Sequence, residues 1–320
     1  MCDAVYLGVD SGGSKTSFVL AKADGQIVAR HAGGAGNFLR RSREEVWGML
    51  SSGVTAVCGK AGIAPEAVAY AGFGFPGYGE SATSAAELDQ MCKDAMGMDR
   101  IACANDAVIA WAGSLALHPG INIIAGTGAN CYGRTAEGHE ARTSGWGAFC
   151  DEGSGQWIGN QAVGIFTKQA DGRMERTALY GLFREHFQLE DDLLFCGLLN
   201  HELATHTSEL AKIQLLVLKA YDMGDAHARA IYDRGAEELW LAIRTTAKKL
   251  GFVDGAYRVS YSGGVFHAGK RILGPLHALV DGHADLRPPR FAPDLGALLM
   301  AMRAAGLEDV GDSFVFTEPA

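Results

Sequence analysis

Two segments of the chain share one order of strands and glycine turns. Residues 5–30 read as an apolar strand, a glycine loop, a second strand, the tight turn "ADG" and a third strand. Residues 121–142, "INIIAGTGANCYGRTAEGHEAR", repeat that order, with Gly25 and Gly138 as corresponding turn residues. A tight turn between two strands predicts a β-hairpin, and internal similarity predicts a duplicated architecture. The sequence therefore predicts two halves, each built around its own sheet.

The remaining sequence mixes strand and helix patterns, which predicts an α/β fold. Ser42 with Glu45, and Ser84 with Glu87, carry the S-x-x-E signature of a helix start. Because 320 residues exceed the roughly 250 to 300 at which one core stops growing, we expect two domains. They are residues 1–117 and 118–320, and the last helix could pack back on the first domain.

Composition limits the classes of partner. The formal net charge is −9 and no stretch concentrates Lys and Arg, so we expect neither nucleic acid nor a membrane surface as a partner. No charged and apolar leader follows Met1 and no run of eighteen apolar residues occurs, so the expected location is the cytoplasm. The seven cysteines show no C-x-x-C spacing and are expected to be reduced.

The two glycine turns suggest phosphate binding. The N–H groups of such turns form anion-binding concavities, and two equivalent turns could hold a polyphosphate across a cleft between the halves. Asp10, at the end of the first strand, is the candidate Mg²⁺ ligand, through water. Each turn alone would be an ordinary hairpin turn, but the matched pair favours phosphate. The candidate turn residues are Gly12, Gly13, Ser14, Lys15 and Thr16 in the first, and Gly126, Thr127 and Gly128 in the second.

Five motifs make the sequence similar to a known family. "GVDSGGSKT", "IIAGTGAN", "SGWG...DEGSGQWIG", "YSGGVF" and "GALLMA" resemble, in order and spacing, the N-acetylglucosamine kinase family and the related BadF/BadG-type ATPases. Both belong to the actin-like sugar-kinase superfamily, and the likeness runs from about residue 5 to 306. It implies an α/β fold with two actin-like (ribonuclease H-like) domains flanking an ATP and sugar cleft, with ATP and Mg²⁺ as cofactors, and a homodimer.

The resemblance also implies roles for single residues. It puts Asp10, Ser14 and Thr127 at the phosphates, and Gly263 with Gly264 at the adenosine. Asp106 falls where the family carries its catalytic base. The residues implied around the sugar are Asn37, Asp106, Gly145, Trp146 and Asp151.

These residue types suit the chemistry, although each has a plain structural alternative. A carboxylate at a strand end can accept the proton of a sugar hydroxyl, but Asp106 could equally be a helix N-cap. Asn37 follows the flexible "GGAG" and could contact a sugar or cap its own loop. Trp146 could stack on a pyranose ring or belong to the core. Asp151 could hold sugar hydroxyls, or it could be, with Glu152, a helix-start acid before Ser154.

The sequence departs from the family pattern just before Asp151. Only three residues separate Gly147 from Asp151, where the family commonly has four that end in glycine. Cys150 stands at the position of that glycine. The shorter loop leaves open where Asp151 lies and which amino sugar the chain prefers.

Two other motifs lack the context that their usual functions require. "GFGFPG" at 72–77 satisfies G-x-G-x-x-G, but Pro76 delays the next helix to about residue 82, whereas a dinucleotide site needs it earlier. We expect a substrate-side loop over residues 75–81, with Tyr78 and Glu80 as possible sugar contacts. "HELATH" at 201–206 has its histidines five apart instead of four, which predicts surface residues and no zinc site.

The resemblance implies ATP-dependent phosphorylation of N-acetylglucosamine, glucosamine or N-acetylmuramate at the 6-hydroxyl. The alternative is a BadF/BadG-type ATPase that activates a reductase or dehydratase through an iron–sulfur cluster bridging a dimer. Closely spaced cysteines would hold that cluster, whereas the closest pair here, Cys92 and Cys103, is eleven apart. A regulator of this superfamily would carry a DNA-binding module, for which residues 1–5 leave no room.

Overall fold

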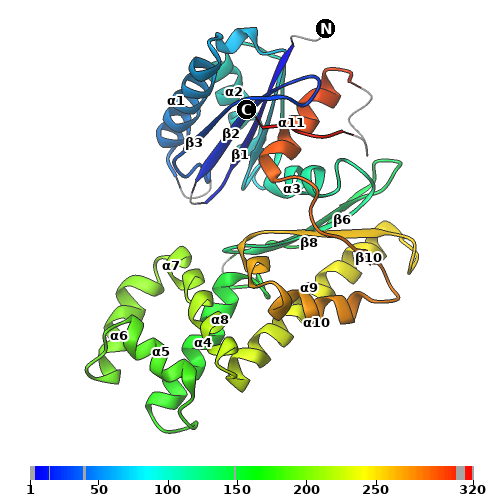
Figure 1. Ribbon diagram of the computed structural model, residues 1–320. Coiled ribbons are helices and arrows are strands. Elements are labelled where there is room, and N and C mark those ends of the chain that lie inside the picture. The colour runs from blue at the N-terminus through cyan, green and yellow to red at the C-terminus, as the bar shows by residue number, and fades with distance from the viewer. Residues whose placement is uncertain (1–3, 14, 39–40, 148, 308–313, 319–320) are drawn as a thin grey trace. The chain divides into compact units, whose positions relative to one another are not determined.

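The computed structural model describes residues 4–13, 15–38, 41–147, 149–307 and 314–318. The chain divides into two compact units (Figure 1). The first consists of Met1–Pro119 and Pro288–Ala320, and the second of Gly120–Arg287. The sequence-based division assigned everything after residue 117 to the second domain and left open where the last helix packs. In the structure the segment from Pro288 onward groups with the first unit.

The first unit is built on a five-stranded sheet of order β3-β2-β1-β4-β5. Its first three strands form two antiparallel hairpins, and β1, β4 and β5 run parallel. The strands are β1 (Val5–Ser11), β2 (Thr16–Lys22), β3 (Ile27–Gly33), β4 (Tyr70–Phe75) and β5 (Ile101–Asn105), and the helices are α1 (Arg43–Ala61), the single-turn η1 (Pro65–Ala67), α2 (Ser84–Met96), α3 (Asp106–Ser114) and α11 (Pro293–Ala304).

The second unit repeats this sheet. Its order, β8-β7-β6-β9-β10, again has two antiparallel pairs followed by two parallel ones. The strands are β6 (Gly120–Ala125), β7 (Ala129–Arg134), β8 (Glu140–Ser144), β9 (Arg258–Ser262) and β10 (Asp285–Leu286). The corresponding turn residues Gly25 and Gly138 have φ values of 91° and 90°. The duplication therefore extends from the hairpins to the whole sheet.

The helices of the second unit include a group that the sequence patterns did not predict. Phe166, Phe183 and Phe195 pack ring against ring, and this aromatic cluster anchors the short helices between residues 178 and 203. No described helix combines the length and apolar character that crossing a bilayer requires. The helices are α4 (Gly155–Ala170), α5 (Ala178–His186), η2 (Asp192–Leu194), α6 (Phe195–Leu198), η3 (Leu199–Leu203), α7 (Thr207–Lys212), α8 (Gln214–Asp222), α9 (Ala226–Leu250), η4 (Gly264–Ala268) and α10 (Lys270–Val280).

The two predicted capping signatures have different outcomes. At α1, Ser42 accepts the Glu45 N–H and the Glu45 carboxylate accepts the Ser42 N–H, so the capping box is confirmed. At α2 the prediction was wrong, because Ser84 is already the first residue of the helix and the N-cap is Thr83, which makes no side-chain capping bond. Ser84 is buried there and exchanges hydrogen bonds with Ser81.

Three glycines explain why the last helix belongs to the first unit. Gly8 of β1 and Gly72 of β4 are register partners, and both lie against the backbone of α11. A Cβ on Gly72 would lie 2.0 Å from the Ala297 carbonyl oxygen, and one on Gly296 would lie 2.0 Å from that of Ile109 in α3. These small residues let α11 approach β1, β4 and α3 at backbone distance, and Figure 1 shows α11 beside α3.

Candidate active site

The first glycine turn closes the β1–β2 hairpin. Ser11 pairs with Thr16, and the Gly12 N–H donates to the Lys15 carbonyl at 2.9 Å. Gly13 and Lys15 are exposed, whereas Thr16 is buried and its hydroxyl donates to the Gly34 carbonyl at 2.8 Å. The Thr16 hydroxyl is therefore used inside the fold. Ser14 lies outside the described residues.

The segment before Asn37 is bound to this turn. The Gly36 N–H donates to the Gly12 carbonyl at 3.1 Å, and a Cβ on Gly36 would lie 2.1 Å from the Ser11 Oγ. That buried oxygen has no hydrogen-bond partner among the described residues. Asn37, which is half-buried, thus follows the residue that contacts the first turn. Two candidates separated by more than twenty residues come together.

Asp10 and Asp106 occupy the same edge of the first sheet. Asp10 is the last residue but one of β1 and Asp106 directly follows β5, and the carboxyl ends of these parallel strands lie at one edge. Burial, then the Asp106 and Asp294 carboxylates, raise the pKa of Asp10 to about 7, and Lys15 opposes this. The N-cap of α3 is Asn105, which accepts the Ala107 N–H at 3.1 Å, so the N-cap alternative for Asp106 was wrong.

Asp294 is a candidate site residue that no sequence pattern indicated. It is buried at the start of α11, where its carboxylate accepts the Ser17 hydroxyl at 2.8 Å and pairs with Arg30 at 2.9 Å. Its charge is among those that raise the pKa of Asp10. Only the glycines that bring α11 close to β1 could have indicated its position, since it lies almost three hundred residues from Asp10.

The second glycine turn rests on the start of a helix. The carbonyls of Gly126 and Thr127 accept the N–H groups of Gly155 and Gln156, the first residues of α4. Gly263, which directly follows β9 beside β6, has a φ of 104°, and a Cβ there would lie 2.4 Å from the Ala125 carbonyl oxygen. The second phosphate candidates and the adenosine candidates Gly263 and Gly264 are therefore neighbours.

The shortened loop before α4 is folded around Asp151. This buried carboxylate accepts the Trp146 and Gly147 N–H groups at 2.9 and 3.1 Å. Burial raises its pKa, while the backbone N–H groups of Gly147, Ala129 and Trp146, and Arg142, oppose the rise. The N-cap of α4 is Ser154 and the first turn of this helix contains no acidic residue, so Asp151 precedes the helix.

The same loop lies beside the second glycine turn. A Cβ on Gly128 would be 2.6 Å from Asp151 Oδ2. Gly145 adopts a φ of 73°, and Trp146 is 86% exposed, so its core alternative was wrong. Cys150, which replaces the family glycine, closes a turn by donating its N–H to the Gly147 carbonyl at 2.9 Å. The one-residue-shorter loop still holds Asp151 next to the turn.

The structure also shows where the "GFGFPG" and "HELATH" motifs lie. Helix α2 begins only at Ser84, which confirms that "GFGFPG" does not open a helix. Asn105, next to Asp106, donates to the Tyr78 carbonyl and to Glu80, while the Tyr78 hydroxyl donates to Asp89. His201 and His206 are exposed, as expected.

The residues around Asp10 fit a divalent cation held through water. Mg²⁺ usually keeps several waters and takes one or two carboxylates together with substrate phosphates. The Asp106 and Asp294 carboxylates repel the charged form of Asp10, and a cation would relieve that repulsion. In the described residues no group of three or more His, Cys, Asp or Glu side chains is arranged to hold a metal directly.

Comparison with known proteins adds the family. The model of the BadF/BadG/BcrA/BcrD ATPase family matches residues 7–301. The chain belongs to this family. An N-acetylmuramic acid/N-acetylglucosamine kinase of Clostridium acetobutylicum is 30% identical to this family member over 82% of this chain and 85% of its own length. An N-acetyl-D-glucosamine kinase of Dictyostelium discoideum is 25% identical over 95% of this chain and 99% of its own length.

Solved structures confirm the fold of this BadF/BadG-type chain. A Chromobacterium violaceum protein, titled as a candidate N-acetylglucosamine kinase, matches with a TM-score of 0.78 at 24% identity, over 93% of this chain and 99% of that one. A glucokinase of the ROK family from Streptomyces griseus, solved with glucose and AMPPNP, matches with a TM-score of 0.61 at 17% identity. The match covers 94% of this chain and 98% of that one. The expected α/β fold with two actin-like domains is thus confirmed.

Proposed function

We propose that this protein phosphorylates an amino sugar, at its 6-hydroxyl, with ATP as donor. The observation that carries the proposal is the common edge of the first sheet, where Asp106, Asp10, the first glycine turn and Asn37 lie together. Both curated relatives are named as amino-sugar kinases, which supports this class of substrate.

In the proposed reaction Asp106 is the general base. Its carboxylate accepts the proton of the sugar 6-hydroxyl as that oxygen bonds to the γ-phosphorus, and the bond from the γ-phosphorus to the bridging oxygen breaks to release ADP. Such a transfer requires mainly positioning and neutralisation of charge. Mg²⁺, when bound, supplies part of that neutralisation at the β- and γ-phosphates. Asp10 would hold it through water.

The nucleotide would be bound mainly by backbone groups. We assign the phosphates to both glycine turns, that is to Gly12, Gly13, Ser14, Lys15 and Thr16 and to Gly126, Thr127 and Gly128. Of these, Thr16 contributes through its backbone, because its hydroxyl already donates to Gly34. Gly263 and Gly264 would contact the adenosine.

The sugar would be bound by Asn37, Asp106, Gly145, Trp146 and Asp151. The exposed Trp146 offers a flat apolar face of the kind that stacks on a pyranose ring. Asp151 would act mostly by fixing the backbone of residues 145–147, since that is where its carboxylate oxygen is engaged. A homodimer and a cytoplasmic location stay predictions.

The proposal is tested by ADP release from the purified protein with Mg²⁺ and ATP across glucosamine, N-acetylglucosamine and N-acetylmuramate. We expect turnover with at least one of them, and a phosphorus NMR signal of the 6-phosphate in the product. Turnover with none would remove the amino-sugar proposal, and a phosphate at another carbon would remove the 6-hydroxyl.

The alternative, activation of a reductase or dehydratase, is supported by a fold likeness. Component A of the (R)-2-hydroxyglutaryl-CoA dehydratase from Acidaminococcus fermentans matches with a TM-score of 0.50 at 14% identity. An absorbance scan of anaerobically purified protein separates the two candidates. An iron–sulfur band between about 350 and 450 nm would favour the activator.

A further inference from the structure

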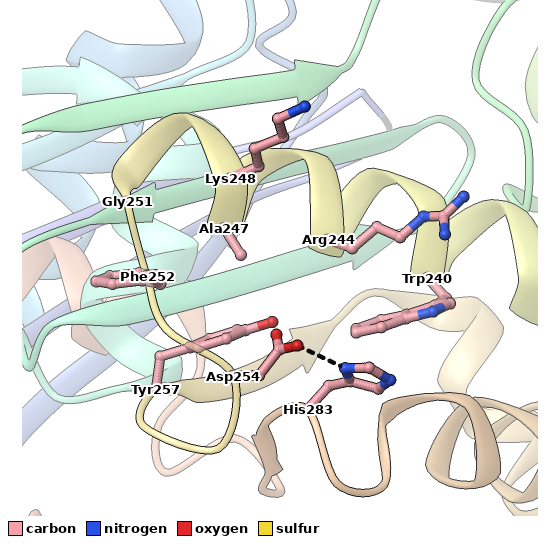
Figure 2. A pocket seen from close by; sticks show the side chains of 9 residues that line it. All are labelled: Trp240, Arg244, Ala247, Lys248, Gly251, Phe252, Asp254, Tyr257 and His283. Atoms are coloured by element: carbon pink, nitrogen blue, oxygen red, sulfur yellow. Dashed lines mark hydrogen bonds and ion pairs between the residues drawn. The ribbon is translucent and has the colours of Figure 1, made fainter.

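A second pocket lies in the second unit and shares no residue with the candidate active site. It has a volume of about 400 Å³ and is formed by the last turns of α9, the loop after Gly251 and His283 (Figure 2). The Gly255 N–H donates to the His283 carbonyl at 2.6 Å, which ties the loop to the segment before β10. A pocket of this size is in the range that holds small ligands.

Aromatic rings form two opposite walls of this pocket. Phe252 and Tyr257 stack with ring centroids 5.3 Å apart, and the rings of Trp240 and His283 are also 5.3 Å apart. Figure 2 shows the first pair on one side and the second pair on the other, with the small side chain of Ala247 and the Asp254 carboxylate, which is hydrogen-bonded to His283, between them. The space between such walls suits a flat or ring-shaped group.

The charges at the pocket favour an anion. Arg244 and Lys248 project from α9 one turn apart, and neither side chain forms a hydrogen bond or ion pair with another described residue. The one carboxylate of the lining, Asp254, accepts a hydrogen bond from Nδ1 of His283 at 3.1 Å. Two permanent positive charges thus stand against one engaged carboxylate, in a chain whose net charge is −9.

The dipole of α9 alone does not explain why both Arg244 and Lys248 lie at the pocket. Cations in the last turn of a helix interact favourably with its dipole, and Lys248 is in that turn. Arg244 lies a turn earlier, where the dipole adds little and Lys248 repels it as a like charge at i,i+4. Arginine and lysine together are the side chains that bind phosphate oxygens.

We propose that this pocket binds a phosphomonoester carried on a ring, such as a sugar phosphate or a mononucleotide. The ring lies between the two aromatic walls and the phosphate meets Arg244 and Lys248. The inference does not depend on the proposed function, because it uses none of the residues assigned to catalysis or to ATP.

Titration calorimetry on the full chain tests the pocket. The probes are adenosine monophosphate, N-acetylglucosamine 6-phosphate and inorganic phosphate, each added with saturating ADP and N-acetylglucosamine to occupy the candidate active site. The double variant Arg244→Ala/Lys248→Ala removes the cations. Lys168→Ala is the matched control, since Lys168 is an exposed lysine in the last turn of α4.

We expect wild type and Lys168→Ala to bind at least one ring-bearing probe, and the double variant to bind it at least tenfold more weakly. Inorganic phosphate should also bind at least tenfold more weakly than that probe, and the preferred probe identifies the source of the ligand. Unchanged affinity in the double variant, equal affinity for inorganic phosphate, or no binding of either ring-bearing probe would overturn the proposal. ADP release by the double variant should stay near that of wild type.

Discussion

Two carboxylates at the edge of the first sheet, those of Asp106 and Asp294, act on a third, that of Asp10. Asp10 and Asp106 come from strand ends, while Asp294 comes from the last helix and is held by Arg30 and Ser17. Burial, together with the repulsion of Asp10 by these two carboxylates, raises the pKa of Asp10 to about 7. A site that makes one carboxylate costly to ionise favours the arrival of a cation and of the phosphates it accompanies.

The Asp106→Asn variant tests the proposed base. Asparagine keeps the shape of the side chain but cannot accept the proton, so ADP release should fall by about 10² to 10⁴-fold. ATP affinity, measured by titration calorimetry, should stay within about threefold of wild type, because the base does not hold the nucleotide. The control variant is Asp99→Asn. The side chain of Asp99 is 90% exposed, and the rate of ADP release by this variant should equal that of wild type. A near-normal rate for Asp106→Asn would exclude Asp106 from the mechanism.

The raised pKa of Asp10 predicts how stability depends on pH without metal or nucleotide. In the folded state Asp10 releases its proton at about pH 7, whereas in the unfolded chain it does so at about pH 3.9. The contribution of Asp10 to the free energy of unfolding is therefore fully present below about pH 4 and is lost as the pH rises through about 7. Asp10→Asn cannot ionise, so it should match wild type at pH 4 and be more stable by about 1 to 3 kcal/mol at pH 8.

Differential scanning calorimetry at both pH values measures this effect, with Asp99→Asn as the control. A rise in Tm of a few degrees for Asp10→Asn at pH 8 is expected. A variant less stable than wild type at pH 8 would mean that the Asp10 carboxylate is stabilised in the fold rather than strained.

At the scale of elements, α11 is joined to the first unit by backbone contact. Gly8, Gly72 and Gly296 each leave no room for a Cβ, because a backbone atom lies within 2.3 Å of its position. This packing carries Asp294 to the sheet edge. The helix is therefore both part of the core and the source of a site residue.

The Gly72→Ala variant should separate α11 from β4. The added Cβ meets the Ala297 carbonyl at 2.0 Å, and backbone cannot move aside cheaply, so unfolding free energy should fall by about 2 to 4 kcal/mol. Gly48→Ala, in α1, is the matched control: its Cβ meets nothing within 4 Å, and alanine should be neutral or stabilising by up to about 1 kcal/mol. Urea denaturation measures both. Equal stability of the two variants would contradict the close packing of α11.

Local signals predicted the elements where the deciding contacts are local. The Ser42–Glu45 capping box is set by residues three apart, and it formed. The same signature at Ser84 failed because Ser84 is buried and bonded to Ser81. Helix α5 has no such cap, since Thr177 makes no side-chain capping bond, and it is held by aromatic packing with distant residues. Asp294 depends on contacts between the two ends of the chain and could not be inferred locally.

At the scale of the whole molecule, the duplicated sheet is the main feature. Both copies place a glycine turn after their central strand, β1 or β6, and both collect candidate ligand residues around that turn. The repeated hairpin pattern in the sequence already predicted that each half has its own sheet. We propose that both turns bind the phosphates of one ATP.

Matched alanine substitutions in the two turns test that claim most directly. At Gly13 and at Gly126 a Cβ would meet nothing within 4 Å, so Gly13→Ala and Gly126→Ala should fold as wild type does. Gly34→Ala, also in open space, is the control. If phosphates approach both turns closely, titration calorimetry will show ATP affinity reduced at least tenfold in each turn variant and unchanged in the control. Wild-type affinity in either turn variant would contradict the account.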